Sequence, residues 1–467
     1  MKTGTNVIHL TLVVALGGLL FGYDTAVISG AVEALQNYFQ LTATELGFAA
    51  SSALIGCVLG AALAGYVSQR YGRRGALIIA ALLFLISAIG SAIPQHYWTF
   101  VIYRIIGGVG VGIASMVSPM YIAEVAPPAR RGGLVAWNQF AIIFGMLVVY
   151  FVNYGIALMG SDNWLNDVGW RYMFASEVIP AALFFGLLFT VPETPRWLAL
   201  KGRDNEAHGL LKALNPQQDV EPQWQEIKQS LVKVHRPGIV AAGYLGVLLI
   251  GIMLSVLQQV TGINVFLYYA PAILKGFSDS TTDIALLQTI LVGAVNLSFT
   301  VLAIFTVDKL GRRPLMMIGA GLMAVSMLAI GTAAYLNAIG GYLLVFMLLY
   351  IAAFALSLGP VTWVLLSEIF PNSVRSRALS IAVFAQWFAN FVVSQTFPMM
   401  NEKESFIFQQ FHGGFPFWIY GIMGIFTVYF IYRWVPETKG KSLEQLEGLW
   451  QRDADQANGR MKTADLS

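Results

Sequence analysis

Long runs of apolar residues alternate with short polar segments along almost the whole chain. A helix rises about 1.5 Å per residue, so roughly 20 apolar residues cross the hydrocarbon core of a bilayer. Segments of this length occur at residues 8–32, 46–68, 75–93, 98–122, 133–158, 171–191, 239–272, 283–307, 315–335, 341–366, 378–400 and 415–434. The pattern therefore predicts an all-α membrane protein with twelve transmembrane helices.

One long polar stretch separates the twelve predicted helices into two sets of six. The apolar spacing within this stretch predicts short amphipathic helices that lie outside the bilayer. We therefore predict four parts: an N-terminal six-helix half (1–192), an intracellular-helix linker (193–238), a C-terminal six-helix half (239–435), and a C-terminal cytoplasmic helix and tail (436–467).

The distribution of Lys and Arg residues indicates the orientation of these helices. If both termini are cytoplasmic, 24 of the 28 Lys and Arg residues fall in cytoplasmic segments, and the outer loops hold only Lys275 and Lys403. This asymmetry satisfies the positive-inside rule. The first apolar run, after Lys2, is longer than the h-region of a signal peptide and lacks an A-x-A-like cleavage site. We predict a multi-pass protein of the cell (inner or plasma) membrane with both termini in the cytoplasm.

Three motifs occur once in each predicted half, in the same order. YGRR at 71–74 returns as LGRR at 310–313, and VPETPRW at 191–197 returns as VPETKGK at 435–441. Between them, an acid and an Arg seven residues apart also recur, as Glu124 with Arg131 and Glu368 with Arg375. Such parallel repeats are typical of transporters, which bind their substrate between two pseudo-symmetric halves near the bilayer midplane.

Composition excludes several other classes of protein. Hydrophobic residues make up 57% of the chain and charged residues 11%, against about 25% charged in soluble domains. A net charge of +3 does not indicate a nucleic-acid partner, and the single cysteine, Cys57, excludes an intramolecular disulfide. The sequence shows no Walker A motif, nucleophile elbow or metal-ligand cluster. We therefore expect neither an enzyme nor a cofactor or metal.

The repeated motifs all fall at predicted cytoplasmic helix ends, where they bring acids and bases together. Anchoring of the helices by solvated Arg side chains would not require the acids. We therefore predict a charge latch that closes the cytoplasmic side and is weak enough to open, since exposed ion pairs contribute only about 0–1 kcal/mol each. Its predicted residues are Arg73, Arg74, Glu124, Arg131, Glu193, Arg312, Arg313, Glu368, Arg375 and Glu437.

Several side-chain amides lie within the predicted membrane helices. They are Gln139, Gln258, Gln259, Asn264, Asn296, Gln386 and Asn390. An amide offers both hydrogen-bond donors and acceptors, as a neutral polyol requires, and nearby Trp and Tyr rings offer flat apolar faces for a sugar ring. Amides also join membrane helices to one another, which is the alternative for any one of them. For the cluster from Gln258 to Asn264, which has a Gly in between, we favour an interrupted helix that lines a cavity.

Three ionisable residues, Asp24, Arg104 and Glu177, fall well inside predicted membrane helices. A charge at the bilayer centre costs roughly 2.5–3.5 kcal/mol on insertion scales, so such residues normally face the interior of the helix bundle and pair with one another. Asp24 and Arg104 therefore form either a static buried ion pair or a proton switch, in which protonation of the carboxylate releases the Arg.

Taken together, the motifs resemble those of the sugar-porter family of the major facilitator superfamily, nearly from end to end. They are GGLLFGYDTAVISG (17–30), YRIIGGVGVG (103–112), PMYIAEVAPPARRG (119–132), QQVTGINVFLYYAP (258–271), GPVTWVLLSEIFP (359–371) and VPETKGKSLEQLE (435–447), together with GRR in both halves and VPETPRW. The resemblance implies the major facilitator fold and transport of a monosaccharide by alternating access.

The resemblance also implies which residues contact the sugar. These are Gln139, Gln258, Gln259, Asn264, Tyr268, Asn296, Trp363, Gln386 and Trp387. At one position the chain departs from the pattern of the xylose-transporting members, because Met146 stands where they have a glutamine. The overall resemblance favours D-xylose as the sugar, and Met146 makes D-glucose or another hexose the next candidate.

Proton-coupled members of the family are similar to this chain in having the Asp of FGYD and an Arg in the fourth helix, whereas passive members typically have an uncharged residue at that Asp. The resemblance thus implies that Asp24 and Arg104 couple transport to a proton and that Glu177 tunes the pair. We predict a proton-coupled sugar symporter that works as a monomer in the lipid bilayer, with the proton as coupling ion. The alternatives are a passive sugar uniporter and, more remotely, a transporter-like sugar sensor.

Overall fold

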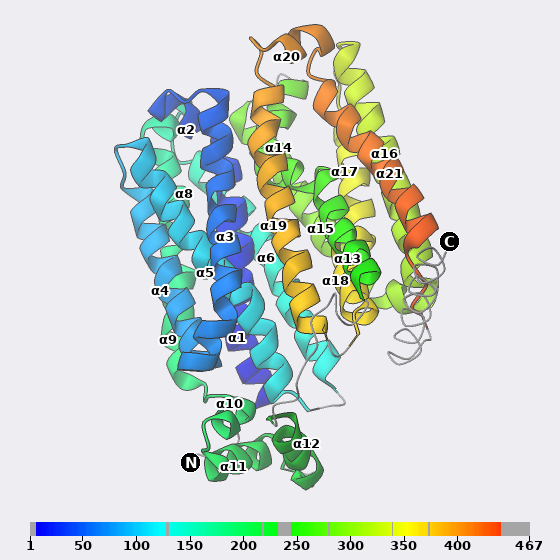
Figure 1. The fold of residues 1–467 in the computed structure, drawn as a ribbon. Helices are drawn as coiled ribbons and strands as arrows, with labels where there is room; N and C mark the ends of the chain where they lie inside the picture. The colour runs from blue at the N-terminus through cyan, green and yellow to red at the C-terminus, as the bar shows by residue number, and fades with distance from the viewer. Residues whose placement is uncertain are drawn as a thin grey trace, which may run out of the picture. The chain divides into compact units, whose positions relative to one another are not determined.

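Every regular element that the computed structural model describes is a helix, so the predicted all-α class is confirmed for these residues (Figure 1). The structure describes residues 6–127, 130–216, 219–231, 244–278, 281–338, 340–371 and 374–439. Within it the chain forms two compact units: Met1–Val234 with Leu267–Gly293, and His235–Phe266 with Ala294–Ser467.

The first unit contains the helices up to α12. They are α1 (Val7–Val27), η1 (Ile28–Gly30), α2 (Val32–Phe39), α3 (Ala43–Tyr71), α4 (Arg73–Ala92), α5 (Tyr97–Val125), α6 (Arg131–Ala157), α7 (Asp162–Trp164), η3 (Leu165–Gly169), α8 (Trp170–Ala175), α9 (Val178–Leu187), η4 (Leu188–Thr190), α10 (Pro195–Leu200), α11 (Asp204–Leu214) and α12 (Glu221–Leu231). The last three lie in the polar stretch, where short helices are predicted.

The remaining helices belong to the second unit, except that α14 and α15 are each divided between the units. They are α13 (Leu245–Val260), α14 (Ile263–Ser278), α15 (Thr282–Leu310), α16 (Arg312–Tyr335), α17 (Tyr342–Leu356), α18 (Leu358–Ile369), α19 (Arg375–Met400), α20 (Phe406–Phe411) and α21 (Phe415–Trp434). The C-terminal helix predicted within 436–467 lies almost entirely outside the described residues.

Part of α14 and α15 packs with the first unit through specific contacts. The Tyr150 hydroxyl donates a hydrogen bond to the Leu267 carbonyl at 3.0 Å, and the Lys275 ammonium lies 2.7 Å from the Glu33 carboxylate. These units therefore cut across the division at residues 193–238 that the sequence predicts, and that four-part division stays a prediction.

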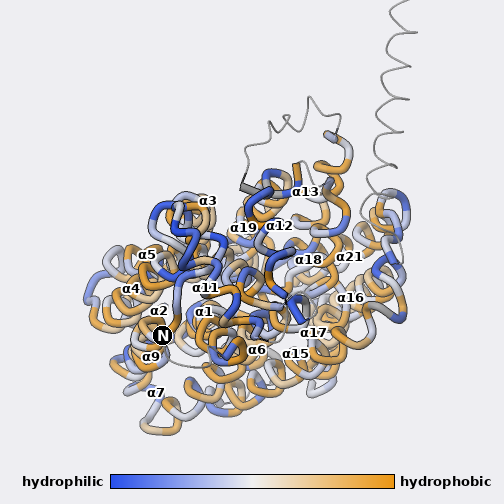
Figure 2. The backbone as a smooth tube through the Cα atoms, turned by 90° about the horizontal axis from the view of Figure 1, so that it is seen from below, coloured by the Kyte–Doolittle hydropathy of each residue, from blue (hydrophilic) through white to orange (hydrophobic). Residues whose placement is uncertain are grey.

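In the described part of the chain, twelve helical segments are long and apolar enough to cross a membrane. Their ends agree with the predicted ranges to within a few residues for most helices. The sixth begins earlier, at Asp162, because the π-helical turn η3 joins the short α7 to α8. Hydrophobic residues predominate along the long helices, for example α4 and α16 (Figure 2).

The glycine of each GRR motif has a structural role at a helix junction. Gly72, between α3 and α4, has φ +92°, and Gly311, between α15 and α16, has φ +89°, values that residues with a side chain rarely adopt. A Cβ atom at Gly72 would also lie 2.0 Å from the Glu193 carboxylate, and one at Gly311 would lie 2.9 Å from that of Glu437. Glycine therefore permits both the sharp turn and the close approach of an acid.

Glycines also allow membrane helices to approach each other closely. A Cβ atom at Gly56 of α3 would lie 2.1 Å from the Ile105 carbonyl of α5, and one at Gly108 would lie 1.9 Å from the Ala53 carbonyl. The GCVLG and GVGVG segments thus face each other, in agreement with the small-residue packing of membrane helices.

Two membrane segments of the second half are interrupted. The seventh breaks between α13 and α14, at Gly262, whose φ is +94°, as predicted for the amide cluster. The tenth breaks between α17 and α18 at Ser357, with φ −125° and ψ −94°, shortly before Pro360, which has no N–H to donate. Both breaks leave backbone groups available to side chains.

Candidate functional site

A buried ion pair joins the first and fourth membrane segments of the first unit. Arg104 of α5 is 1% exposed and Asp24 of α1 is fully buried. Arg104 Nη1 lies 2.7 Å from Asp24 Oδ1, and Nη2 donates to the Asp24 backbone carbonyl at 2.9 Å. The guanidinium also lies 5.5 Å from the centre of the Phe174 ring. The structure thus confirms that Arg104 is the partner of Asp24.

Glu177 completes a buried cluster of three ionisable residues. It lies between α8 and α9, is 1% exposed, and is close enough to Asp24 and Arg104 to interact electrostatically with both. The helix is interrupted here because Pro180 has no N–H for the Ser176 carbonyl, which accepts instead from the amide of Ile179 at 3.3 Å. Only Asp24 forms an ion pair with the guanidinium, and neither carboxylate oxygen of Glu177 has a hydrogen-bond partner among the described residues.

Four of the predicted amides form one hydrogen-bonded group in the second unit. Gln258 Oε1 accepts from Gln259 Nε2 at 3.1 Å and from Gln386 Nε2 at 2.8 Å. Asn264 Nδ2 donates to Gln259 Oε1 at 2.5 Å. The side chains come from α13, α14 and α19, and all are at least nine-tenths buried. A buried group of this kind has donors and acceptors but no net charge.

The other predicted sugar ligands are distributed over both units. Gln139 of α6 and Tyr268 of α14 belong to the first unit. Asn296 of α15 and Trp387 of α19 are buried in the second unit, where Trp363 of α18 is 38% exposed. Among the residues described, no hydrogen bond joins Asn296 or Trp363 to the amide group.

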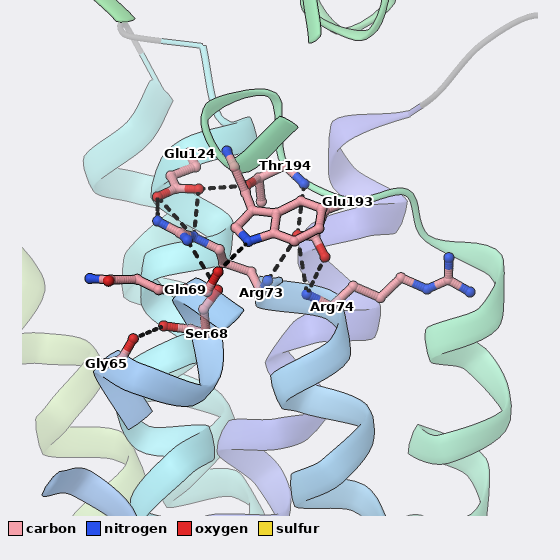
Figure 3. Close-up of polar contacts among 9 residues, drawn as sticks. Gly65, Ser68, Gln69, Arg73, Arg74, Glu124, Glu193 and Thr194 are labelled. Carbon is pink, nitrogen blue, oxygen red and sulfur yellow. Dashed lines mark hydrogen bonds and ion pairs between the residues drawn. The ribbon is translucent and has the colours of Figure 1, made fainter. Parts of the chain in front are cut away.

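The first half of the predicted charge latch centres on one ion pair (Figure 3). Arg73 Nε donates to both carboxylate oxygens of Glu124, at 3.2 and 3.1 Å, and Nη2 donates at 2.9 Å. The Thr194 hydroxyl donates to the same carboxylate at 2.6 Å. Arg73 and Glu124 side chains are each 9% exposed.

The second half repeats this arrangement. Arg312 Nη2 lies 2.9 Å from Glu368 Oε1, and the Thr438 hydroxyl donates to Glu368 Oε2 at 2.5 Å. This pair is more exposed, at 12% for the Arg and 23% for the Glu. The sequence repeat is therefore a repeat of contacts as well.

The acids of the two VPET motifs bind helix N-termini. Glu193 accepts from the backbone N–H of Arg73 at 2.9 Å and of Arg74 at 3.1 Å, at the start of α4. Glu437 accepts from the backbone N–H of Arg312 and Arg313, both near 3.0 Å, at the start of α16. Each carboxylate thus satisfies amides that have no partner within the helix and complements its dipole.

The surroundings of these two acids shift their pKa values in opposite directions. Burial raises the pKa of Glu193 above its ordinary value of 4.5, although backbone N–H groups oppose the shift. Burial acts in the same sense on Glu437, but the N–H groups of Lys439, Arg312, Arg313 and Thr438 outweigh it and lower the pKa.

The structure corrects one feature of the predicted latch. Seven-residue spacing suggests that Glu124 pairs with Arg131, but Glu124 pairs with Arg73, and Arg131 is exposed at the start of α6 without an ion pair to a described residue. Arg375 Nε donates to the Phe370 carbonyl at 3.1 Å. Spacing along the chain does not determine these contacts, because each acid and the following Arg lie on different helices, α5 and α6 in the first half and α18 and α19 in the second.

A family model described as "Sugar (and other) transporter" matches residues 10–450 of the chain. The chain belongs to this sugar transporter family. With its twelve apolar spans among the described residues, it is a multi-pass membrane transporter of the major facilitator fold, and not an enzyme.

Its relatives include proteins of assigned activity. The chain is 56% identical over 473 residues to the D-xylose-proton symporter of Escherichia coli K12, with 95% of this chain and 96% of the relative covered. It is 42% identical to the arabinose-proton symporter of Bacillus subtilis 168, with 95% of each covered. The inward-open structure of the xylose transporter XylE from E. coli matches with a TM-score of 0.84 and 54% identity, over 95% of this chain and all of that one.

The sequence reading of this transporter missed several polar groups. Thr194 and Thr438, which donate to the latch carboxylates, directly follow the acids of the VPET motifs, and the sequence pattern does not distinguish them. The Tyr23 hydroxyl lies 2.7 Å from the Ser176 hydroxyl. Tyr23 directly precedes Asp24 and Ser176 directly precedes Glu177, so the neighbours of the two buried acids contact each other. Their positions beside Asp24 and Glu177 in the sequence are a signal that could have identified them.

Proposed function

We propose that the protein imports a monosaccharide together with a proton, by alternating access. The observation that carries the proposal is the buried pair of Asp24 and Arg104, with Glu177 beside it. A uniporter has no need of ionisable groups in the hydrocarbon, where they cost several kcal/mol unless paired. The D-xylose-proton and arabinose-proton symporters among its relatives support the same conclusion.

The proton acts on the ion pair. When Asp24 is protonated from outside, the attraction of its side chain for Arg104 is lost, and the Arg keeps its contact to the Asp24 backbone carbonyl. Glu177 then remains as the acid that stabilises the buried guanidinium. When the proton leaves to the cytoplasm, the pair re-forms and the carrier resets.

The membrane potential supplies the driving force for accumulation. One elementary charge that moves through 100 mV releases about 2.3 kcal/mol, which supports roughly fifty-fold accumulation of the sugar.

The amide group of the second unit supports a neutral polyhydroxylated substrate. Its four amides carry donors and acceptors without charge, and the predicted ligands Gln139, Tyr268, Asn296, Trp363 and Trp387 add further polar groups and aromatic faces. D-Xylose is the first candidate because of the symporter that is 56% identical. Met146, apolar where the resemblance implies a glutamine in the xylose symporter, makes D-glucose or another hexose the second.

The remaining predictions belong to the same proposal. Both termini lie in the cytoplasm, in agreement with the excess of Lys and Arg in the segments assigned to that side. The chain works as a monomer in the lipid bilayer, with two six-helix halves, a linker at 193–238 and a cytoplasmic C-terminal segment. The predicted latch acts at the cytoplasmic side, where the ion pair of Arg73 with Glu124 stabilises the first unit and that of Arg312 with Glu368 stabilises the second.

The test uses purified protein in proteoliposomes with labelled D-xylose and D-glucose. Asp24→Asn removes the charge and keeps the size of the side chain. We expect the variant to exchange sugar across the membrane but to lose accumulation driven by an imposed proton gradient. Asp162→Asn, which changes an exposed acid at the start of α7, is the matched control and is expected to accumulate sugar like the wild type.

Two results would contradict the proposal. Accumulation by Asp24→Asn under a proton gradient would show that Asp24 does not carry the proton. The absence of external alkalinisation when sugar is added to unbuffered cells expressing the wild type would favour the passive uniporter.

A further inference from the structure

We propose that sugar binding releases a clasp formed by Gln258, which holds the interrupted tenth membrane segment when no sugar is bound. The clasp consists of the side-chain amide of Gln258 and the backbone carbonyls of Leu358 and Gly359. The inference rests on the proposed function in assuming that a sugar binds at the amide group, and it adds how occupancy of that site changes α18.

The amide of Gln258 is fully occupied. Its Nε2 atom donates to the Leu358 carbonyl at 2.8 Å and to the Gly359 carbonyl at 3.1 Å. Its Oε1 atom accepts from Gln259 and Gln386. A glutamine amide has two N–H donors and two acceptor positions, and all four are used here. The side chain is 2% exposed, so water does not provide a further partner.

The two carbonyls lie in the first turn of α18, directly after the break in the helix, and that of Leu358 also accepts from the Thr362 hydroxyl at 2.7 Å. α17 ends at Leu356, and Ser357 leaves the helical conformation with ψ −94° before α18 begins. Pro360 has no N–H, so it leaves the carbonyl four residues earlier without its usual helical donor. Gln258 thus fastens the first turn of α18 to α13 at the point where the backbone is interrupted.

The neighbouring amide has an unused acceptor. Gln386 is 8% exposed, and its Oε1 atom is buried with no hydrogen-bond partner among the described residues. A buried acceptor without a donor is costly, so a hydroxyl group that donates to it is favoured. The structure therefore offers a first position for a sugar hydroxyl next to the occupied amide of Gln258.

Competition for the amide follows from these two observations. A sugar oxygen beside Gln386 that accepts from Gln258 takes an N–H that otherwise binds Leu358 or Gly359. Sugar occupancy then weakens the attachment of the α18 turn, because Gln258 keeps only one of its two carbonyl contacts. Sugar binding and opening of the clasp are coupled, so each favours the other. A substitution that already opens the clasp therefore removes the response of α18 to sugar.

The experiment is hydrogen–deuterium exchange of the full chain in lipid nanodiscs, with and without saturating D-xylose or D-glucose. Gln258→Leu and Gln258→Glu each remove the N–H donors, and the second keeps the shape and an acceptor. Gln259→Leu is the matched control, because the Gln259 side chain belongs to the amide group but makes no hydrogen bond to α17 or α18 among the described residues.

We expect sugar to increase exchange in wild-type peptides that cover residues 357–366, by roughly fivefold if one ordinary hydrogen bond is lost. Without sugar, both Gln258 variants should already show this raised exchange, and Gln259→Leu should not. Unchanged exchange in peptides from α3 and α5 checks that each variant is folded.

Three outcomes would overturn the inference. In the first, sugar slows exchange in α13 and α19 but does not raise it in residues 357–366. This result would show that Gln258 keeps its contacts, and the proposed function would stand. Gln258 variants with wild-type exchange in the absence of sugar show that the clasp does not hold the break. A lack of any response to either sugar contradicts sugar binding and the clasp together.

Discussion

The two repeated ion pairs differ in burial, and this difference predicts unequal contributions to stability. Arg73 and Glu124 are each 9% exposed, whereas Arg312 and Glu368 are 12% and 23% exposed. Replacing each Glu with Gln removes the charge and preserves the size. The sequence repeat makes each variant a control for the other.

The magnitude follows from burial and geometry. Two unit charges 4 Å apart attract each other by about 4 kcal/mol at an effective dielectric constant of 20, and desolvation offsets part of this gain. For Glu124→Gln, where Arg73 reaches both carboxylate oxygens, we expect a loss of about 2–3 kcal/mol, since a poorly solvated guanidinium loses its anion. For Glu368→Gln we expect about 1 kcal/mol, because water screens the more exposed carboxylate.

The assay is unfolding of the purified transporter in mixed micelles with increasing dodecyl sulfate, followed by tryptophan fluorescence. Glu402→Gln, which removes an exposed acid, should have almost no effect. Added salt should reduce the cost of Glu368→Gln more than that of Glu124→Gln. An equal or larger loss for Glu368→Gln would show that burial does not determine the strength of these pairs.

The same unfolding assay tests two further pairs of substitutions, one by the pH dependence of stability and the other by the loss of stability. The raised pKa of Glu193 means that the folded protein binds a proton more tightly than the unfolded chain, so its contribution to stability declines as the pH rises above 4.5, and Glu193→Gln should remove this decline. The lowered pKa of Glu437 gives stability that is present above pH 4.5 and lost as the pH falls, and Glu437→Gln should remove that loss; matching pH profiles for the two variants between pH 4 and 7 would refute this assignment. Gly22→Ala would place a Cβ atom 1.8 Å from the Ile142 carbonyl and should reduce folded yield and stability by several kcal/mol, whereas Gly186→Ala meets no atom within 4 Å and should be tolerated; equal stability of the two would contradict the close α1–α6 packing.

Most of the fold could be predicted because its determinants are local. The apolar run length needed to cross a bilayer is a strong constraint, and it locates the twelve helices. The repeated GRR and VPET motifs locate the same junction twice. The sequence could not show that Glu193 binds the start of α4 through backbone amides, because that contact joins residues about 120 positions apart.

The candidate site was predicted in part, for a similar reason. Burial cost singles out Asp24 and Arg104 in the sequence, since both need a partner in hydrocarbon, and the structure pairs them at 2.7 Å. Residue type also singles out the amides near Gln258. It does not reveal that the amide of Gln258 already has four partners, two of them backbone carbonyls, because no side-chain pattern marks an available carbonyl.

The two halves, although repeated in sequence, carry different chemistry at corresponding kinds of position. In the first unit, the proton-binding candidates include Glu177, at the interruption between α8 and α9, and in the second unit Gln258 contacts the interruption between α17 and α18. An uninterrupted membrane helix satisfies its own backbone, so a change in one side chain has little effect on its shape. At an interruption, side chains complete the hydrogen bonding. Two events can therefore change the conformation at an interruption: protonation of an acid, and binding of a sugar to an amide. Each costs one or two hydrogen bonds, and the free energy supplied by each proposed ligand is of the same size.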